Sequence, residues 1–419
     1  MAVNNPLNVT RLSSPSTDDS AVTNSAASVW NLLLAASVAD PGENDISRIR
    51  GLVEPSVDWA AVLHLAEHHG TSSIVYRNLS RLSNVIPPDP LRELCQRYEQ
   101  NVHKSLLLAT ELIRILDCVE ALRIELIPYK GALLSENYYG DMAIRQSGDI
   151  DLFVRAGDVA QVKDAVRELG YVPRVNIPKW AQGDYLATGY ECTFDSPAGK
   201  NLLELQWALQ SRFYAVDFEM EGLFARAVEG TVAGRAVKTL APEDLLLVLC
   251  AHAAKHAWGR LIWLCDIAQI VKRENLNWDL VRGRVRTYGI ERILHISLLL
   301  AKRFCRMEIP AAFEAALDDE TAALVDEVAG NMACGVSFEQ EQVSYFWFMM
   351  RLRERRMDRV RFLTRLAFTP GPGEWEAVRL PRFLFPLYRV VRLARLAGRL
   401  GRGIYRLAKP PAVSPPSMV

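Results

Sequence analysis

Residues 146–155 have the sequence Gln-Ser-Gly-Asp-Ile-Asp-Leu-Phe-Val-Arg, in which two aspartates, Asp149 and Asp151, alternate with apolar residues. The pattern predicts a buried β-strand. Side chains two positions apart leave a strand on the same face, with backbones roughly 6 to 7 Å apart. Two neighbouring carboxylates repel each other and are costly to bury unless a positive charge lies between them. Magnesium prefers hard oxygen ligands of this kind. The stretch therefore predicts metal-assisted phosphate chemistry.

The composition indicates a folded protein without a strong overall charge. Half of the 419 residues are apolar, and 49 basic residues balance 49 acidic ones, so no global field attracts nucleic acid or an anionic membrane. The longest strongly apolar run, residues 245–254, is about half of the roughly 20 residues that a membrane helix needs. The seven cysteines are scattered and include no C-x-x-C pair, which predicts reduced thiols in a cytoplasmic protein.

Changes of pattern divide the chain into five segments. Residues 1–27 are rich in Ser, Thr and Asn and lack a signal sequence, which predicts a disordered leader. Residues 28–123 carry apolar residues at helical spacing and predict an N-terminal helical region. Residues 124–240 predict the sheet core. Residues 241–370 predict a C-terminal helical domain, and residues 371–419 a basic amphipathic tail.

The core segment predicts a small mixed sheet with helices between its strands. Extended runs are expected at 125–129, 149–155 and 171–175, with helices at 132–139 and 159–169. Turn residues 196–199 predict a hairpin between 190–195 and 201–207. Helices at 243–256, 261–274, 278–288 and 290–306 would pack against this sheet as a bundle. The fold class expected is therefore α/β (α+β).

Three features join the aspartate pair in one sheet-sized neighbourhood. Lys130-Gly131 lies where a strand gives way to a helix, and glycine allows the backbone to approach a phosphate closely. Glu204 is a carboxylate within an apolar strand, and Arg145 could neutralise phosphate charge. Each also has a structural explanation, since Glu204 could face water, Lys130 could extend along a helix start, and Arg145 could pair with Asp141.

Several motifs together resemble a known family. They are Tyr129-Lys130-Gly131-Ala132-Leu133-Leu134, Tyr138-Tyr139-Gly140-Asp141, Arg145 with residues 147–154, Asp58-Trp59, His68-His69-Gly70, residues 203–207, and the helix that contains His252 and His256 with Trp263-Leu264-Cys265-Asp266. This set is similar to the bacterial nucleotidyltransferases described as uncharacterised, within the polymerase-beta-like nucleotidyltransferase superfamily. The likeness extends from about residue 29 to about residue 390.

The resemblance implies a polymerase-beta-like sheet core and metal-dependent transfer of a nucleotidyl group from a nucleoside triphosphate. Asp149 and Asp151 would take the two metal-ligand positions and Glu204 the third carboxylate position, with Mg²⁺ or Mn²⁺ as the cofactor. Residues assigned to binding the nucleotide and its phosphates are Lys130, Gly131, Arg145, Ser147 and Lys255. The chain departs from the superfamily pattern at the phosphate turn, where Lys130-Gly131-Ala132 stands in place of Gly-Ser or Gly-Gly.

His252 and His256 are four residues apart on a predicted helix, the spacing at which two imidazoles can share a zinc ion. No glutamate follows the pattern H-E-x-x-H, so the zinc-protease motif is absent. The alternative is that both rings pack in an aromatic-rich helix. Lys255, between them, is the residue of this helix assigned to the triphosphate.

The C-terminal stretch 379–409 contains no acid and places arginines at steps of three or four: Arg389, Arg392, Arg395, Arg399, Arg402 and Arg406. Leucines lie between them, which predicts a helix with a basic stripe beside an apolar one. Such a helix could lie peripherally on an anionic membrane surface or bind RNA. The alternative is a docked helix whose arginines meet acids elsewhere in the chain.

The function expected is transfer of a nucleoside monophosphate from a nucleoside triphosphate to an acceptor that the sequence does not identify. Two other classes stay open. One is a catalytically degenerate nucleotide-binding or regulatory module, favoured by the missing serine of the phosphate turn. The other is a toxin-like enzyme that modifies RNA or protein, for which the basic tail would be the relevant feature.

Overall fold

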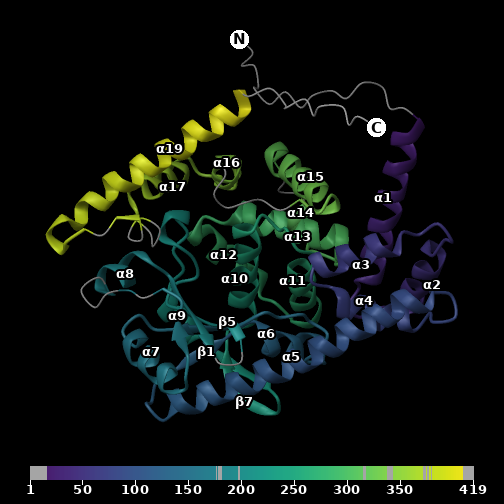
Figure 1. Cartoon of the computed structure of the whole chain (residues 1–419), viewed down its shortest axis with the longest axis horizontal. Helices are drawn as coiled ribbons and strands as arrows, with labels where there is room; N and C mark the ends of the chain where they lie inside the picture. The colour runs from purple at the N-terminus through teal and green to yellow at the C-terminus, as the bar shows by residue number, and fades with distance from the viewer. Residues whose placement is uncertain are drawn as a thin grey trace, which may run out of the picture.

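A computed structural model of the chain describes residues 17–408 except 176, 178–181, 197–198, 315–317, 337–342, 371–373, 375–376 and 379. Figure 1 shows a small sheet in the lower middle of the molecule, with the long helix α5 (Pro88–Glu120) running beneath it. The C-terminal helices lie on the other side of the sheet. The fold is therefore the mixed α/β arrangement that the sequence predicted.

The central sheet has five strands in the order β1-β2-β5-β4-β3, where β2 and β5 are parallel and the other neighbours are antiparallel. The strands are β1 (Leu126–Pro128), β2 (Ile150–Val154), β3 (Val172–Pro173), β4 (Glu191–Ser196) and β5 (Gly199–Gln206). Each coincides with an extended run expected from the sequence. The parallel register sets Asp151 directly opposite Glu204.

The two faces of this sheet differ in polarity because side chains alternate along each strand. Ile150 and Leu152 of β2 lie in an apolar core shared with α5 and α7 (Val159–Glu168). Asp151, Glu204 and Gln206 alternate with such apolar positions, which places them on the opposite face. The strand pattern thus gathers the polar side chains of β2 and β5 on one side of the sheet.

Short helices connect and flank the strands. They are α6 (Gly131–Leu134), the π-helical turn η1 (Ser135–Tyr139), α8 (Gln182–Thr188), the 3₁₀ turn η3 (Arg212–Tyr214) and α9 (Met220–Ala225). The helix expected at 132–139 is thus present as α6 followed directly by η1.

A second sheet, which the sequence pattern did not predict, is the hairpin of β6 (Val228–Val232) and β7 (Arg235–Thr239). Its two-residue turn, Ala233-Gly234, has positive φ at both positions, 48° and 77°. Both residues thus have the left-handed backbone conformation of a tight hairpin turn, and alanine is a poor sequence signal for it. β7 lies beside β1, and Thr239 Oγ1 donates a hydrogen bond to Pro128 O at 2.8 Å.

The N-terminal region is helical, as predicted. Its helices are α1 (Thr17–Ala36), α2 (Glu43–Leu52), α3 (Trp59–His68), α4 (Ser72–Ser80) and α5. Because α1 begins at Thr17, the expected leader of residues 1–27 is too long at its C-terminal end. Alanines in residues 17–27 favour helix despite the surrounding Ser, Thr and Asn. Residues 1–16 lie outside the described residues.

A tight turn separates α3 from α4. Gly70, at φ 69°, reverses the chain there. This turn lets His69 accept hydrogen bonds from the first amides of α11 (Leu261–Arg273): Leu261 N to Nδ1 at 3.2 Å and Ile262 N to the carbonyl at 3.1 Å. The turn therefore satisfies helix-end amides that would otherwise lack a partner.

The C-terminal bundle begins as predicted with α10 (Pro242–Lys255), α11, α12 (Trp278–Tyr288) and α13 (Glu291–Cys305). Proline and two acids start α10, while the Asn277 side chain caps α12 and Gly289 ends it at φ 65°. The chain continues through α14 (Ala311–Glu314), α15 (Asp319–Ala333), α16 (Val343–Arg351), α17 (Arg356–Phe368), η4 (Arg382–Leu387) and α19 (Tyr388–Ala408). Among the described helices, none has the length and apolarity to cross a membrane.

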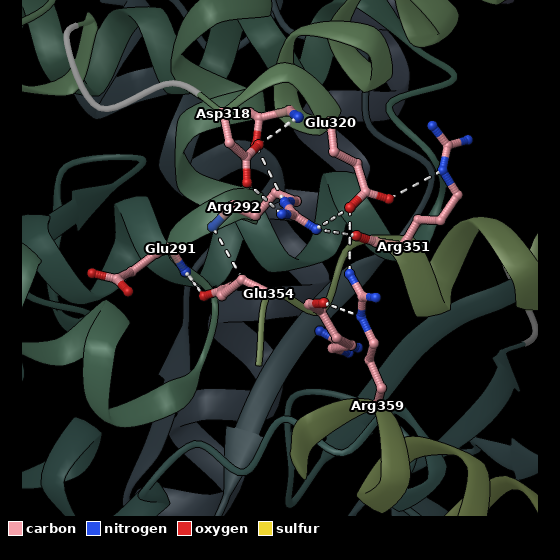
Figure 2. A network of polar contacts seen from close by, with 9 residues as sticks. Glu291, Arg292, Asp318, Glu320, Arg351, Glu354 and Arg359 are labelled. Carbon is pink, nitrogen blue, oxygen red and sulfur yellow. Dashed lines mark hydrogen bonds and ion pairs between the residues drawn. The ribbon is translucent and has the colours of Figure 1, made fainter. Parts of the chain in front are cut away.

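A polar network holds these later helices to α13 (Figure 2). The Arg292 guanidinium of α13 donates to Asp318 Oδ2 at 2.6 Å and to the Arg351 carbonyl of α16 at 2.6 Å. Glu320 of α15 accepts from Arg292 at 3.3 Å and from Arg359 of α17 at 3.4 Å. Because Arg292 is buried, these bonds fix four helices relative to one another.

Candidate active site

A cavity of about 1160 Å³ lies over the polar face of the sheet. Its floor includes Asp151, Glu204 and Gln206, and its walls come from α5, the α3–α4 turn and the end of α10. Every residue that the sequence nominated for the site lines this cavity except Gly131: Lys130, Arg145, Ser147, Asp149, Asp151, Glu204 and Lys255. Residues as far apart in the sequence as Lys130 and Lys255 thus line one cavity.

A hydrogen-bonded chain holds the carboxylates of the floor. Lys130 Nζ donates to Asp151 Oδ1 at 2.9 Å, and both side chains are more than nine-tenths buried. Gln206 Nε2 donates to Glu204 Oε2 at 3.0 Å and approaches Asp151 Oδ1 at 3.4 Å. Tyr129 donates to Gln206 Oε1 at 2.7 Å, which turns the amide nitrogen toward the two acids. The floor therefore combines concentrated negative charge with fixed donors.

Burial and mutual repulsion alter the acidity of this group. Burial, reinforced by the Asp151 carboxylate, raises the pKa of Asp149 to about 6. Burial, reinforced by Asp151 and Glu191, raises the pKa of Glu204 to about 8. Within the described residues, no three or more His, Cys, Asp or Glu side chains form a group that could hold a metal ion. Metal binding by Asp149, Asp151 and Glu204 therefore stays a prediction.

Glu204→Gln should make the metal-free protein more stable at pH 8. In the unfolded chain Glu204 ionises near pH 4.5, whereas in the folded protein it keeps its proton until about pH 8. The folded state therefore binds more protons across this window, so the free energy of unfolding falls as pH rises through it. Glutamine removes that loss, and we expect a gain of about 1 to 3 kcal/mol at pH 8 and little change at pH 4.5.

Urea unfolding in EDTA between pH 4.5 and 8.5 measures this effect. Glu229→Gln, at an exposed glutamate of β6, is the matched control and should follow the native protein at every pH. A Glu204→Gln curve parallel to the native one across the window would show that the carboxylates do not interact as described.

The Lys130-Gly131 turn lies against the aspartate segment. Gly131 has a φ of 64°, and a Cβ built on it would lie 3.4 Å from the Asp149 carbonyl oxygen. A side chain there would be strained and would press on the segment that carries Asp149. The glycine thus allows close approach of backbone to backbone, which differs from the approach to a phosphate that the sequence suggested.

Arg145 is held by Asp266 of α11 and not by Asp141, the partner considered from the sequence. Its Nε and Nη2 atoms lie 2.9 Å from Oδ1 and Oδ2 of Asp266, and both side chains are buried. Its Nη1 donates to Ser147 Oγ at 2.8 Å. Asp141 instead accepts a local bond from Ala143 N at 2.8 Å. Arg145 and Ser147 therefore brace the chain just before Asp149.

At the wall formed by the end of α10, Lys255 Nζ donates to the Tyr190 hydroxyl at 3.1 Å and lies 4.6 Å from the centre of the Tyr190 ring. His252 and His256 pack with Trp263, at ring-centroid distances of 4.9 to 5.4 Å. Burial lowers the pKa of His256 to about 3 and that of His252 well below its ordinary value, so both rings are neutral. Their packing matches the aromatic alternative to a zinc site.

The sequence did not nominate several cavity residues: Lys104, Glu191, Gln206 and Arg260. Gln206 had a signal, because it lies two positions after Glu204 on the same face of β5. Glu191 pairs with Gln206 across β4 and β5, which only the register reveals. Lys104 and Arg260 are exposed and distant in sequence, and their side chains make no hydrogen bond or ion pair to any described residue. No local pattern distinguishes them from ordinary surface cations.

Comparison with known families agrees with this arrangement. The chain matches the family described as "Uncharacterised nucleotidyltransferase" over residues 55–306, a range that contains the sheet and every residue nominated for the cavity. No curated protein and no solved structure gave a match. The matched range covers more than half of the 419 residues. The chain therefore belongs to this family of uncharacterised nucleotidyltransferases.

Proposed function

We propose that the chain transfers a nucleoside monophosphate from a nucleoside triphosphate to an acceptor in the cavity over the sheet, with Mg²⁺ or Mn²⁺ as cofactor. One observation carries the proposal. Asp151 and Glu204 lie opposite each other on parallel strands, in the same cavity as Asp149 and the Lys130 ammonium. Family membership supports transfer of a nucleotidyl group as the general reaction.

The donors at this site suit a divalent cation chemically, although the described side chains do not form a ready-made group that could hold a metal ion. Asp149, Asp151 and Glu204 offer hard oxygen ligands, and burial, reinforced by the neighbouring carboxylates, raises the pKa of Asp149 and Glu204, a cost that a bound cation would relieve. A bound Mg²⁺ or Mn²⁺ would neutralise charge on the phosphate oxygens. Lys130 already places one positive charge 2.9 Å from Asp151.

The basic residues around the cavity would bind the triphosphate. Lys255 is half-buried beside Tyr190, and Lys104 lies close enough to Asp149 to affect its pKa. Both ammonium groups line the cavity and can donate to phosphate oxygens. The Arg145 guanidinium is already hydrogen-bonded to Asp266 and donates to Ser147. We therefore propose that Arg145 positions Ser147 and Asp149 and does not bind the phosphates.

In the reaction, an acceptor oxygen would attack the α-phosphorus, the bond to the β-phosphate oxygen would break, and pyrophosphate would leave. The acceptor proton has to move to a base. We assign this role to Glu204 in its ionised form, because its carboxylate lines the cavity and is held by a hydrogen bond from Gln206 at 3.0 Å.

A second candidate is a nucleotide-binding module without turnover. The observation in its favour is that the phosphate turn lacks the superfamily's serine and that Lys130, which stands in this turn, forms an ion pair with Asp151. In that case the same cavity would bind a nucleotide, while the paired carboxylate would take no part in chemistry.

Incubation with each of the four labelled nucleoside triphosphates and Mg²⁺ tests the proposal. We expect pyrophosphate release from at least one of them in the presence of a cell extract that supplies acceptors, and its loss in EDTA. Calorimetry with the same nucleotides separates the second candidate, because heat of binding without pyrophosphate would favour the module. If no nucleotide bound and none released pyrophosphate, both candidates would be refuted.

A further inference from the structure

The outer sides of α17 and α19 expose an unusual number of large apolar side chains. On α17 they recur at steps of three to five residues, and from the end of η4 into α19 at steps of three, so each helix shows them along one side. We call this set the C-terminal apolar face; its members are between 41% and 72% exposed and are Met357, Val360, Leu363, Phe368, Leu387, Val390 and Leu393.

The inner side of α19 is docked, which fixes the outer side in place. Arg392 Nε donates to the Leu366 carbonyl of α17 at 2.6 Å, and Arg392 and Arg395 both pair with the buried Glu374, at 3.3 and 3.1 Å. The docked-helix alternative for the basic tail is therefore correct for these two arginines. Figure 1 shows α17 and α19 together at the edge of the molecule opposite α5.

The charge on this surface has one sign. The single acid of α17, Asp358, is buried, and residues 379–409 contain no acid at all. Arg356 and Arg389 are exposed on the two helices. On the described outer sides of α17 and α19 themselves, aliphatic side chains are therefore combined with cations, and neither helix exposes a carboxylate that would repel phosphate groups.

This chemistry distinguishes between candidate partners. A lipid surface buries aliphatic side chains in its interface and binds arginines through headgroup phosphates. Single-stranded RNA uses arginines but stacks its bases on aromatic rings, and of the seven described side chains that define this face six are aliphatic or thioether and one, Phe368, is aromatic. A second copy of the chain would present the same cations and no exposed acid of α17 or α19 to pair with them.

We propose that the C-terminal apolar face binds the surface of an anionic membrane, with its aliphatic side chains in the interface and Arg356 and Arg389 at the headgroups. Helices α17 and α19 lie outside the matched family range of residues 55–306, so this surface is independent of the cavity. The polar network that includes Arg359 holds α17 rigidly against the bundle (Figure 2). Membrane contact would then bring the cavity to substrates at a lipid surface.

Co-sedimentation of the full chain with vesicles tests the proposal. We expect binding to vesicles that contain phosphatidylglycerol, weaker binding as ionic strength rises, and little binding to pure phosphatidylcholine. Leu363→Ser/Leu393→Ser should weaken binding by at least about tenfold because two leucines no longer enter the interface. Leu106→Ser/Leu122→Ser removes two leucines, each 50% exposed, from the α5 region and should leave binding unchanged.

Three results would overturn the inference. Absence of binding to anionic vesicles is the first, and equal loss in both double variants is the second. The third is a dimer in light scattering that Leu363→Ser/Leu393→Ser dissociates without any vesicle binding by the native chain, which would assign the face to a second copy. Tighter binding to single-stranded RNA than to vesicles would likewise assign the face to RNA.

Discussion

Replacing Asp151 by asparagine should abolish nucleotide turnover while the protein remains folded. The substitution keeps the shape of the side chain and removes its charge. Asp151 is the centre of the site: it faces Glu204 across the parallel strands, bonds to Lys130 and raises the pKa of both Asp149 and Glu204. Loss of one charged group that stabilises a transition state costs about a thousandfold in kcat, and we expect at least that loss in pyrophosphate release.

Asp164→Asn is the matched control, since that aspartate lies on α7 of the same core with its side chain 74% exposed. It should retain native activity. The double variant Asp149→Asn/Asp151→Asn should be at most a few-fold less active than Asp151→Asn. Residues that act as a unit lose their function together, so the second substitution adds little. Pyrophosphate release that survives the double substitution would remove these carboxylates from the mechanism.

The aspartate strand and its partners could be predicted because their signals are local. Alternation of polar and apolar residues over 146–155 and 202–207 fixes which side chains share a face of a strand. That rule placed Asp149 and Asp151 on one face of their strand, and the structure brings both into one cavity with Glu204. The bundle helices α10 to α13 carried equally local start and stop signals, such as Asn277 and Gly289.

The interactions that complete the site are not local. Arg145 is hydrogen-bonded to Asp266, which is 121 residues away in the sequence, and Tyr129 to Gln206, which is 77 residues away. The parallel register of β2 and β5 is set by packing between distant segments, because parallel strands need a long connection. The sequence offered Asp141 as a partner for Arg145 since it was near in the chain, whereas tertiary packing supplied a buried acid instead.

The Arg145–Asp266 pair should prove essential for stability. Asp266 is fully buried, bonds to two nitrogens of Arg145 and accepts from the Tyr139 hydroxyl at 2.8 Å. Asp266→Asn leaves the Arg145 charge buried without a counter-charge, a change that costs about 3 to 5 kcal/mol. Urea unfolding at neutral pH measures this loss.

Nucleotide binding should weaken in the same variant, because Arg145 also holds Ser147 in the segment that ends at Asp149. Calorimetry at a temperature where the variant is folded should show a dissociation constant at least about tenfold higher. Asp244→Asn is the matched control: Asp244 is equally buried and bonds to Arg226 and Arg284, but it lies outside the cavity. It should lower stability and leave nucleotide affinity unchanged.

Arg145→Met/Asp266→Leu separates the two roles of the pair. Apolar side chains of similar size remove both buried charges, and replacing a buried ion pair in this way often restores stability. We expect the double variant to unfold near the native urea concentration, yet to bind nucleotide as weakly as Asp266→Asn, because no donor remains for Ser147. Native affinity in the double variant would show that the pair stabilises the fold without positioning the aspartate segment.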